Sequence, residues 1–474
     1  MKMEHVIFRM CSIFLSLQKA SFIIRITETY AVLIRTNNKC FQKGRNGLMR
    51  NIYIGDAGTT VQYMQLALKR AGYDIAVNGE FTRDTCKALG RFLGEGVGCY
   101  VDTSVWLKLM PYLQGYTTHI ITLGESLWGI AEAYDTTLSA IVTANPSVEP
   151  SNLQVGTRIY VPFSFALVSE EVPYTSEFTQ LIIEGLQVRY PFLVTGSIGR
   201  SVMNNELRFI RLGRGAAQVS YNASFHANEW ITTPVLLKFA EEYAGAYADG
   251  GALYGTDSKE LFENYSLYLI PMVNPDGVNL VNGVLPEGNY LEQTRRIASG
   301  YPSIPYPDGW KANINGVDLN LQFPAGWEQA KQIKFGQGYT SPAPRDYVGE
   351  APVSQPESRA MYDFTKANDF QLILAYHTQG EVIYWKYLDY EPENSRRIAD
   401  YFGNVSGYLV EETPYASGHA GYKDWFIEQY NLPGYTIEAG IGENPLNMSQ
   451  FAGIYEDNKL ILLGGMTQII GKSP

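Results

Sequence analysis

The chain has 474 residues, which at roughly 150 residues per domain predicts about three domains. Apolar residues make up 45% of it and aromatic residues 13%, enough for a large core and too much for a disordered protein. The formal net charge is −11, whereas nucleic-acid binding depends on Lys and Arg that neutralise phosphates. We therefore expect a globular, multi-domain protein that does not bind nucleic acid.

Residues 1–48 differ from the rest, because they carry a net charge of +6 and leave −17 for the other residues. Arg9 and Lys19 interrupt their apolar stretch, so it offers neither a membrane helix of about 18 uncharged residues nor a convincing signal peptide. The run Lys43-Gly44-Arg45 before Met49 could be a translated ribosome-binding sequence. We expect that translation starts at Met49 and that residues 1–48 are a gene-model extension or a disordered leader.

Residues 51–115 are expected to form a small helical domain. Apolar positions with helical spacing run from Val61 to Leu68 and from Ala88 to Phe92, and a turn signal over 77–81 separates them. The segment resembles the peptidoglycan-binding domain of many cell-wall hydrolases. The alternative is a helical dimerisation or spacer domain. All four cysteines lie in the first 99 residues without CxxC spacing, which excludes thiolate zinc and redox motifs.

Residues 116–163 predict a strand, a turn at Gly124, two short helices and a closing strand over 158–161. Asn145-Pro146, Gly156 and Ile159 are among the positions through which this segment resembles a LysM domain over its full length. That resemblance implies binding to glycans that contain N-acetylglucosamine, such as peptidoglycan. A purely structural role explains part of this pattern, because Leu127, Ile130 and Ile159 are expected to pack inside.

Residues 170–474 are long enough for one catalytic domain. Strand-like runs over 207–212 and 217–225, which we expect to pair, precede a helix over 232–246. Short apolar runs over 266–273, 372–376 and 434–437 are typical of buried strands. The alternation predicts an α/β domain with a parallel or mixed central sheet and a site at the strand ends.

Histidines follow two of these predicted strands. His226 and Glu229 are spaced i and i+3, so they lie on one face of a starting helix, and His377 ends another strand. Each alone has an ordinary explanation, a surface pair or a core histidine. Together they form a two-His, one-carboxylate set that leaves zinc an open position for water.

A zinc-bound water needs a base, and Glu438 follows the strand over 434–437. A carboxylate is costly to bury there unless it has a task or a partner, so the alternative is a salt-bridged Glu.

Over residues 175–470 the sequence resembles the zinc carboxypeptidase family, in which a mixed sheet is flanked by helices. The resemblance implies that His226, Glu229 and His377 hold one zinc ion and that Glu438 is the general base. In the run Gly316-Val317-Asp318-Leu319-Asn320, it implies that Asp318 orients His226 and that Asn320 binds substrate. Lys311 stands where an Arg would polarise the scissile carbonyl. The run 274–277 (Asn-Pro-Asp-Gly) matches a family loop.

The sequence departs from digestive carboxypeptidases at two arginines. Leu321 follows Asn320 where those enzymes carry the Arg that grips a terminal carboxylate, and Asn228 replaces another Arg. An uncharged side chain cannot make the two-pronged bond of an Arg. We therefore expect no ordinary C-terminal exopeptidase and no fixed cation for a terminal α-carboxylate.

The runs HANEW, YHTQGEVIYW and IEAGIGENPL resemble one branch of the family, the γ-D-glutamyl-L-diamino acid endopeptidases. These enzymes cut peptidoglycan stem peptides between γ-D-glutamate and diaminopimelate. The second carboxylate and amine of diaminopimelate predict charged partners, for which Lys423 and Asp424 are candidates; the alternative is two solvated loop charges. His419 contacts substrate or caps a turn, and Tyr415 stands near the place of a mobile substrate-binding Tyr in the family.

We therefore expect a zinc endopeptidase that acts on peptidoglycan stem peptides and is anchored to glycan strands. A carboxypeptidase that trims wall peptides and a catalytically silent wall-binding protein are the alternatives, and the second is disfavoured because all four metal and base residues are present. We expect synthesis in the cytoplasm and action on cell-wall or spore-wall material or its fragments, with no membrane partner. The sequence leaves the oligomeric state open.

Overall fold

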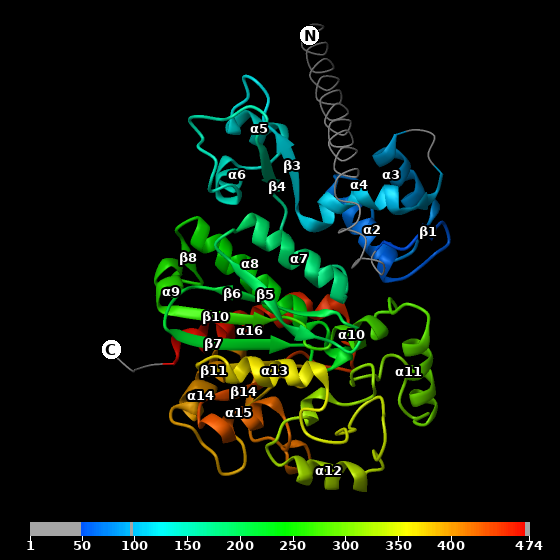
Figure 1. Cartoon of the computed structure of the whole chain (residues 1–474), viewed down its shortest axis with the longest axis vertical. Coiled ribbons are helices and arrows are strands. Elements are labelled where there is room, and N and C mark those ends of the chain that lie inside the picture. The colour runs from blue at the N-terminus through cyan, green and yellow to red at the C-terminus, as the bar shows by residue number, and fades with distance from the viewer. Residues whose placement is uncertain (1–48, 95–97, 470–474) are drawn as a thin grey trace. The chain divides into compact units, whose positions relative to one another are not determined.

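The computed structural model describes residues 49–94 and 98–469 and divides the chain into two compact units, residues 1–166 and 167–474 (Figure 1). The expected gene-model extension over residues 1–48 lies outside the described residues and stays a prediction. Among the helices that are described, none has the length and apolar character needed to cross a membrane.

The first unit begins with a small helical domain, as predicted. Its elements are β1 (Ile52–Tyr53), α2 (Thr59–Arg70), α3 (Arg83–Leu93), β2 (Tyr100–Val101) and α4 (Thr103–Gln114). A disulfide joins Cys86 on α3 to Cys99 just before β2, a bond that the spacing of the cysteines did not predict. The peptidoglycan-binding role of this domain stays a prediction.

The second half of this unit has the predicted strand–helix–helix–strand order. Its elements are β3 (Tyr116–Ile120), α5 (Leu127–Ala133), α6 (Leu138–Ala144) and β4 (Arg158–Pro162). β3 and β4 pair antiparallel, and the helices pack a small apolar core against them. Ser126 and Thr137 begin the two helices by accepting backbone N–H bonds, from Gly129 and Ala140, which satisfies donors that a helix start leaves free.

An eight-stranded mixed sheet forms the centre of the second unit, in the order β13-β12-β14-β11-β7-β10-β6-β5. Its strands are β5 (Val194–Arg200), β6 (Glu206–Leu212), β7 (Ala217–Ala223), β10 (Tyr265–Ile270), β11 (Phe370–His377), β12 (Val382–Tyr384), β13 (Leu409–Glu411) and β14 (Gly434–Glu438). β10, β7, β11 and β14 run parallel to one another, whereas β6 and β12 join them antiparallel.

Helices cover both faces of this sheet, as Figure 1 shows for α7 and α8 on one face and α13 on the other. The longer helices are α7 (Ser176–Arg189), α8 (Thr232–Ala248), α11 (Asn289–Ser299), α12 (Trp327–Gly336), α13 (Pro356–Lys366), α14 (Ser395–Ser406), α15 (Tyr422–Tyr430) and α16 (Phe451–Thr467). The shorter elements are β8 (Ala252–Leu253), β9 (Thr256–Asp257), α9 (Ser258–Asn264) and α10 (Pro275–Val281). α13 and α15 share one buried cluster with the sheet, which includes Met361 and Trp425.

The predicted pairing of the strands over 207–212 and 217–225 is wrong. β10 lies between them, antiparallel to β6 and parallel to β7. The connection from β6 to β7 passes directly over the start of β10, where a Cβ on Gly213 would lie 2.0 Å from the Tyr265 carbonyl oxygen and one on Gly215 1.8 Å from the Asn264 carbonyl carbon. The two glycines therefore allow β10 to lie between the two strands that the sequence pattern predicted to pair.

The parallel strands place the candidate residues at one edge of the sheet. His226 lies three residues after the end of β7, His377 is the last residue of β11 and Glu438 is the last residue of β14. β7, β11 and β14 are neighbours, and His377 is the register partner of Glu438. The carboxyl ends of parallel strands meet at one edge, so residues far apart in the chain come together.

Candidate active site

His226 and Glu229 begin and end a single turn of 3-10 helix, η1 (Ala227–Glu229), that follows β7. The turn places Nδ1 of His226 2.9 Å from Oε1 of Glu229. Glu229 is only 1% exposed, and its side chain would be costly to bury without partners. The predicted common face of the i, i+3 pair is therefore confirmed.

His377 completes this cluster from the neighbouring strand. Its Nδ1 atom lies 2.9 Å from Oε2 of Glu229 and 3.2 Å from Nδ1 of His226. The ring of Phe225 stacks on His377 with an interplanar angle of 14°, which fixes the plane of the imidazole. One potential ligand atom from each of the three residues lies within 4.8 Å of the others.

This donor set fits zinc. Two imidazole nitrogens and one carboxylate are the ligands that catalytic zinc sites use while a position stays open. The charges already favour a cation here: burial acts to lower the pKa of His226, but Glu229 and Asp318 outweigh it and raise that pKa to about 9. Burial opposes ionisation of Glu229, yet His226 and Lys311 hold its pKa well below the usual range.

Asp318 supports His226 from the opposite side of the ring. Nε2 of His226 donates to Oδ1 of Asp318 at 3.1 Å, which leaves Nδ1 facing the cluster. Burial opposes ionisation of Asp318, but the neighbouring His226 keeps its pKa far below the usual range. Asn320, in the 3-10 turn η2 (Leu319–Leu321), lies with Nδ2 3.4 Å from Nε2 of His377. Asp318 and Asn320 therefore each lie beside one of the two histidines, and the roles expected for them stay predictions.

Lys311 lies beside the cluster, with Nζ 2.9 Å from Oε1 of Glu229. Burial acts to lower the pKa of Lys311, but Glu229 outweighs burial and raises it, so the ammonium stays charged. Asn274 fixes the main chain here, because its Nδ2 donates to the carbonyl oxygens of Phe225 and Ala312 at 3.2 and 3.0 Å. The run 274–277 is therefore a brace between the two segments that carry His226 and Lys311.

Glu438 faces the cluster from the end of β14. It is partly buried, and burial together with Glu229 raises the pKa of its carboxyl, while His377 acts against that rise. No hydrogen bond from another described residue fixes its carboxylate. A carboxylate with a raised pKa beside a metal cluster is suited to accept and return a proton.

Two cavities meet at this site. The first, of about 240 Å³ and here named the Asn320 cavity, is lined by residues that include His226, Asp318, Asn320, Leu321, Lys334, Asp346, Lys423 and Asp424. The second, of about 550 Å³ and named the Asn228 cavity, is lined by residues that include Asn228, Ser303, Gln379, Glu443 and Asn444. Lys311, Arg345, Tyr384 and Glu438 line both, so the two cavities adjoin at these four residues.

Lys423 and Asp424 are not solvated loop charges. They lie in the first turn of α15, are 4% and 3% exposed, and line the Asn320 cavity. Nζ of Lys423 lies 2.6 Å from Oδ1 of Asp424 and donates to the Lys386 carbonyl oxygen at 2.7 Å. A buried pair of opposite charges is therefore available at one wall of this cavity.

Tyr415 and His419 lie outside the cavity linings, although Thr413, Pro414 and Ser417 of the same segment line the Asn320 cavity. Tyr415 is 63% exposed in the 3-10 turn η3 (Tyr415–Ser417). His419 is buried against the rings of Tyr415 and Tyr387, and its ring nitrogens make no hydrogen bond to any described residue. Their substrate-binding roles stay predictions.

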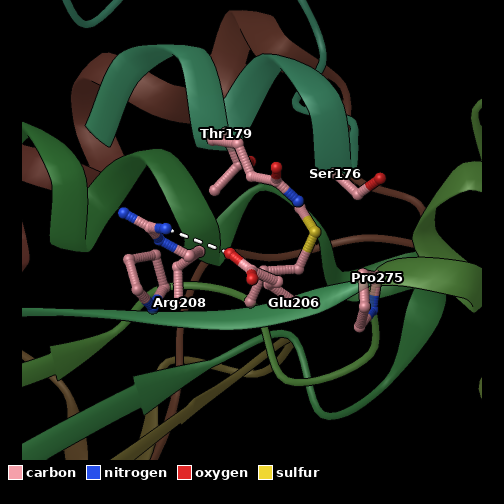
Figure 2. A pocket seen from close by; sticks show the side chains of 8 residues that line it. Ser176, Thr179, Glu206, Arg208 and Pro275 are labelled. Carbon is pink, nitrogen blue, oxygen red and sulfur yellow. Dashed lines mark hydrogen bonds and ion pairs between the residues drawn. The ribbon is translucent and has the colours of Figure 1, made fainter. Parts of the chain in front are cut away.

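A further small cavity is unrelated to this chemistry. Figure 2 shows Ser176 and Thr179 of α7 above Glu206 and Arg208 of β6, whose side chains form an ion pair of 3.0 Å. Its volume of about 10 Å³ is the space of a single water molecule, and none of the metal-cluster residues lines it.

Two family models match this chain, one in each of the two units. Residues 180–460 match the family described as Zinc carboxypeptidase, and residues 119–162 match the LysM domain. The chain belongs to the zinc carboxypeptidase family. A relative from Lysinibacillus sphaericus, gamma-D-glutamyl-L-diamino acid endopeptidase 1, is 44% identical over 400 residues, which cover 73% of this chain and 99% of the relative.

Two other relatives match the peptidase part. Uncharacterized protein YqgT of Bacillus subtilis (strain 168) is 41% identical over 298 residues, 62% of this chain and 77% of that protein. Carboxypeptidase B of Bos taurus is 25% identical over 268 residues, 52% of this chain and 58% of that protein. These two bacterial relatives are thus much more similar in sequence to this zinc carboxypeptidase than carboxypeptidase B of Bos taurus is.

Sequence reasoning missed Arg345 and Tyr384, which line both cavities of this zinc carboxypeptidase. Arg345 lies in the connection between α12 and α13, which has no strand or helix of its own. One signal was available: Arg345 and Asp346 are the sole charged residues between Lys334 and Glu350. Tyr384 ends β12 and gives no comparable signal.

Proposed function

We propose that this zinc peptidase hydrolyses the amide bond between the γ-carboxyl of D-glutamate and diaminopimelate in bacterial peptidoglycan stem peptides. The similarity to the endopeptidase of Lysinibacillus sphaericus, which extends over 99% of that protein, is the observation that carries the proposal. The loss of arginine at positions 228 and 321 supports it, because a digestive carboxypeptidase relies on those cations.

His226, Glu229 and His377 would hold one zinc ion, and Asp318 would keep the His226 ring in the orientation that ligation needs. When bound, zinc supplies Lewis acidity, which polarises a carbonyl and lowers the pKa of a water. Metal binding requires His226 and His377 without a proton on the ligating nitrogen. The Nε2 bond to Asp318 leaves Nδ1 of His226 directed at the other two candidate ligands.

Glu438 would take a proton from the attacking water on a carboxylate oxygen and return it to the departing amine of diaminopimelate. Its raised pKa suits both steps, because the carboxyl then binds and releases a proton with less difference in free energy. Lys311 would donate from Nζ to the carbonyl oxygen of the scissile amide as negative charge develops on it. Its contact with Glu229 places the ammonium at the cluster.

The Asn320 cavity is the candidate site for diaminopimelate. Lys423 and Asp424 offer a cation and an anion for the distal carboxylate and amine of that residue, and Asn320 offers an amide. Both charges are buried, so a substrate group that contacts them would bind with little competition from water.

The LysM domain would hold the enzyme on glycan strands of the cell wall, close to stem peptides. Tethering raises the local concentration of substrate and leaves the chemistry unchanged. We infer from this that the protein acts on wall material or its fragments.

The test is digestion of L-Ala-γ-D-Glu-diaminopimelate by the full-length, zinc-loaded protein, with products assigned by mass spectrometry. The proposal expects L-Ala-D-Glu and free diaminopimelate, and a loss of kcat of about 10²- to 10⁴-fold in Glu438→Gln with zinc still bound. Glu328→Gln is the matched control, because Glu328 is exposed on α12 and lines neither cavity. Cleavage of α-linked peptides in preference to the tripeptide would instead assign a carboxypeptidase.

A further inference from the structure

Arg345 is a cation at the active site that the proposed mechanism does not use. Its Nε atom donates to Oδ2 of Asp346 at 2.7 Å, while its two Nη groups make no hydrogen bond to any described residue. The side chain is 41% exposed, whereas the side chains of Lys311 and Lys334 are 17% and 11% exposed. Arg345 therefore has a pair of free donors on an accessible edge.

The charge of Arg345 is only partly neutralised. Asp346 accepts hydrogen bonds from both Arg345 and Lys334, so one carboxylate serves two cations. Lys423 differs, because it forms a buried ion pair with Asp424, which accepts from no second described Lys or Arg. A second anion beside Arg345 would complete the local balance of charge.

The position of Arg345 is fixed by its neighbour. Asp346 has a φ of +66°, a left-handed conformation that Asp tolerates, and its N–H donates to Oδ2 of Asp318 at 3.2 Å. Asp318 in turn accepts the hydrogen bond from His226. A short chain of contacts thus ties the guanidinium to the metal cluster, with the two Nη groups left side by side as a carboxylate requires.

Arg345 also lies between the two cavities. It lines the Asn320 cavity and the Asn228 cavity together with Lys311, Tyr384 and Glu438. A substrate group that reaches Arg345 therefore lies near Lys311 and Glu438, the two residues that act on the scissile amide in the proposed mechanism. In the proposed substrate two carboxylates meet this condition: the α-carboxylate of D-glutamate and the carboxylate at the L-centre of diaminopimelate, next to the scissile nitrogen.

We propose that Arg345 is a specificity-determining residue that binds a substrate carboxylate adjacent to the scissile amide through its two Nη groups. This inference rests on the proposed function, and it is an alternative to the expectation, drawn from Leu321, that the site has no fixed cation for a terminal α-carboxylate. The cation is present but comes from the connection between α12 and α13. The two candidate carboxylates differ in their place in the substrate, so amidating one at a time separates them.

The experiment compares the full-length, zinc-loaded wild type with Arg345→Gln on three tripeptides. One is L-Ala-γ-D-Glu-diaminopimelate, and the others carry a carboxamide at the α-position of D-glutamate or at the L-centre of diaminopimelate. Wild type should lose about 10- to 100-fold in kcat/KM on one of the two amides, as expected for a hydrogen bond to a charged group. Arg345→Gln should lose a similar factor on the free acid and show no further loss on that same amide.

Arg396→Gln is the matched control, because Arg396 also donates through Nε to an aspartate, Asp400, and lines neither cavity. It should behave as wild type on all three tripeptides. Arg345→Lys keeps the charge without the paired donors and should recover only part of the loss. An equal loss in Arg345→Gln on all three tripeptides would overturn the proposal and leave Arg345 a purely structural role.

Measurements of tripeptide binding test this inference independently of the proposed function. In a Glu438→Gln background, the Kd of each tripeptide is measured by calorimetry with and without Arg345→Gln. A contact with Arg345 predicts weaker binding of the free acid and unchanged binding of the matching amide, whichever bond the active enzyme cuts. If wild type cuts only α-linked peptides, the proposed function fails, and the same calorimetric comparison on those peptides and their C-terminal amides still decides the role of Arg345.

Discussion

Glu357 gives a prediction on stability that the structure allows to be worked in numbers. It lies in the first turn of α13, is fully buried, and accepts hydrogen bonds from the Val202 N–H at 3.0 Å and from Nδ2 of Asn313 at 3.1 Å. Burial, reinforced by Asp276, raises the pKa of its carboxyl from 4.5 to about 7. Asn313 also accepts the N–H of Val317 next to Asp318, so Glu357 supports the segment behind His226.

The direction in which stability changes with pH follows from proton binding by Glu357. A carboxyl with a raised pKa binds its proton more tightly in the folded state, so its contribution to stability falls as the pH rises from about 4.5 through 7. The cost of ionising Glu357 grows by about 2.5 kcal/mol between pH 5 and pH 8 at 1.36 kcal/mol per pKa unit. Glu357→Gln carries no such cost, although it gives up one accepted hydrogen bond, worth about 1 kcal/mol at every pH.

The assay is urea unfolding of the full-length wild type and of Glu357→Gln at pH 5, 6, 7 and 8. The difference in free energy of unfolding should move by about 2.5 kcal/mol in favour of the variant across this range. Glu328→Gln, at an exposed position on α12, should show no such trend. A difference between wild type and Glu357→Gln that is the same at all four pH values would refute the reasoning.

Three further predictions concern the metal, the wall and the disulfide. His377→Ala should lose bound zinc and activity together while the peptidase unit stays folded, and stoichiometric zinc by mass spectrometry would remove His377 from the site. Deleting residues 1–163 should abolish sedimentation with insoluble wall and leave tripeptide hydrolysis nearly unchanged; full sedimentation would refute LysM anchoring. Cys86→Ser should lower the stability of the helical domain by about 3 kcal/mol, measured by unfolding of the full-length protein, because the bond to Cys99, 13 residues away, restricts the unfolded chain.

The metal cluster was predictable because its signals are local. Each of His226, His377 and Glu438 follows a short apolar run, and the carboxyl ends of parallel strands meet at one edge. The strand neighbours were not predictable, because Gly213 and Gly215 act through the space they leave for β10, which a sequence pattern does not encode.

The candidate role of Arg345 also could not be predicted from the sequence. Its role depends on Asp346, whose left-handed backbone turns one carboxylate toward two cations and one N–H toward Asp318. These contacts join segments that are separated along the chain and have no periodic pattern. Lys423 and Asp424 were predicted as candidates, but their burial depends on the packing of α15 and could not be inferred from two adjacent charges.

The order of the strands has a consequence for when the enzyme becomes active. His226 follows β7, and His377 and Glu438 end the adjacent strands β11 and β14, yet β14 is the last of the described strands to be synthesised. A nascent chain that ends between β11 and β14 contains all three candidate ligands but still lacks its base. For a protein that cuts wall peptides, catalytic competence is thus delayed until nearly all of the peptidase sheet has been translated.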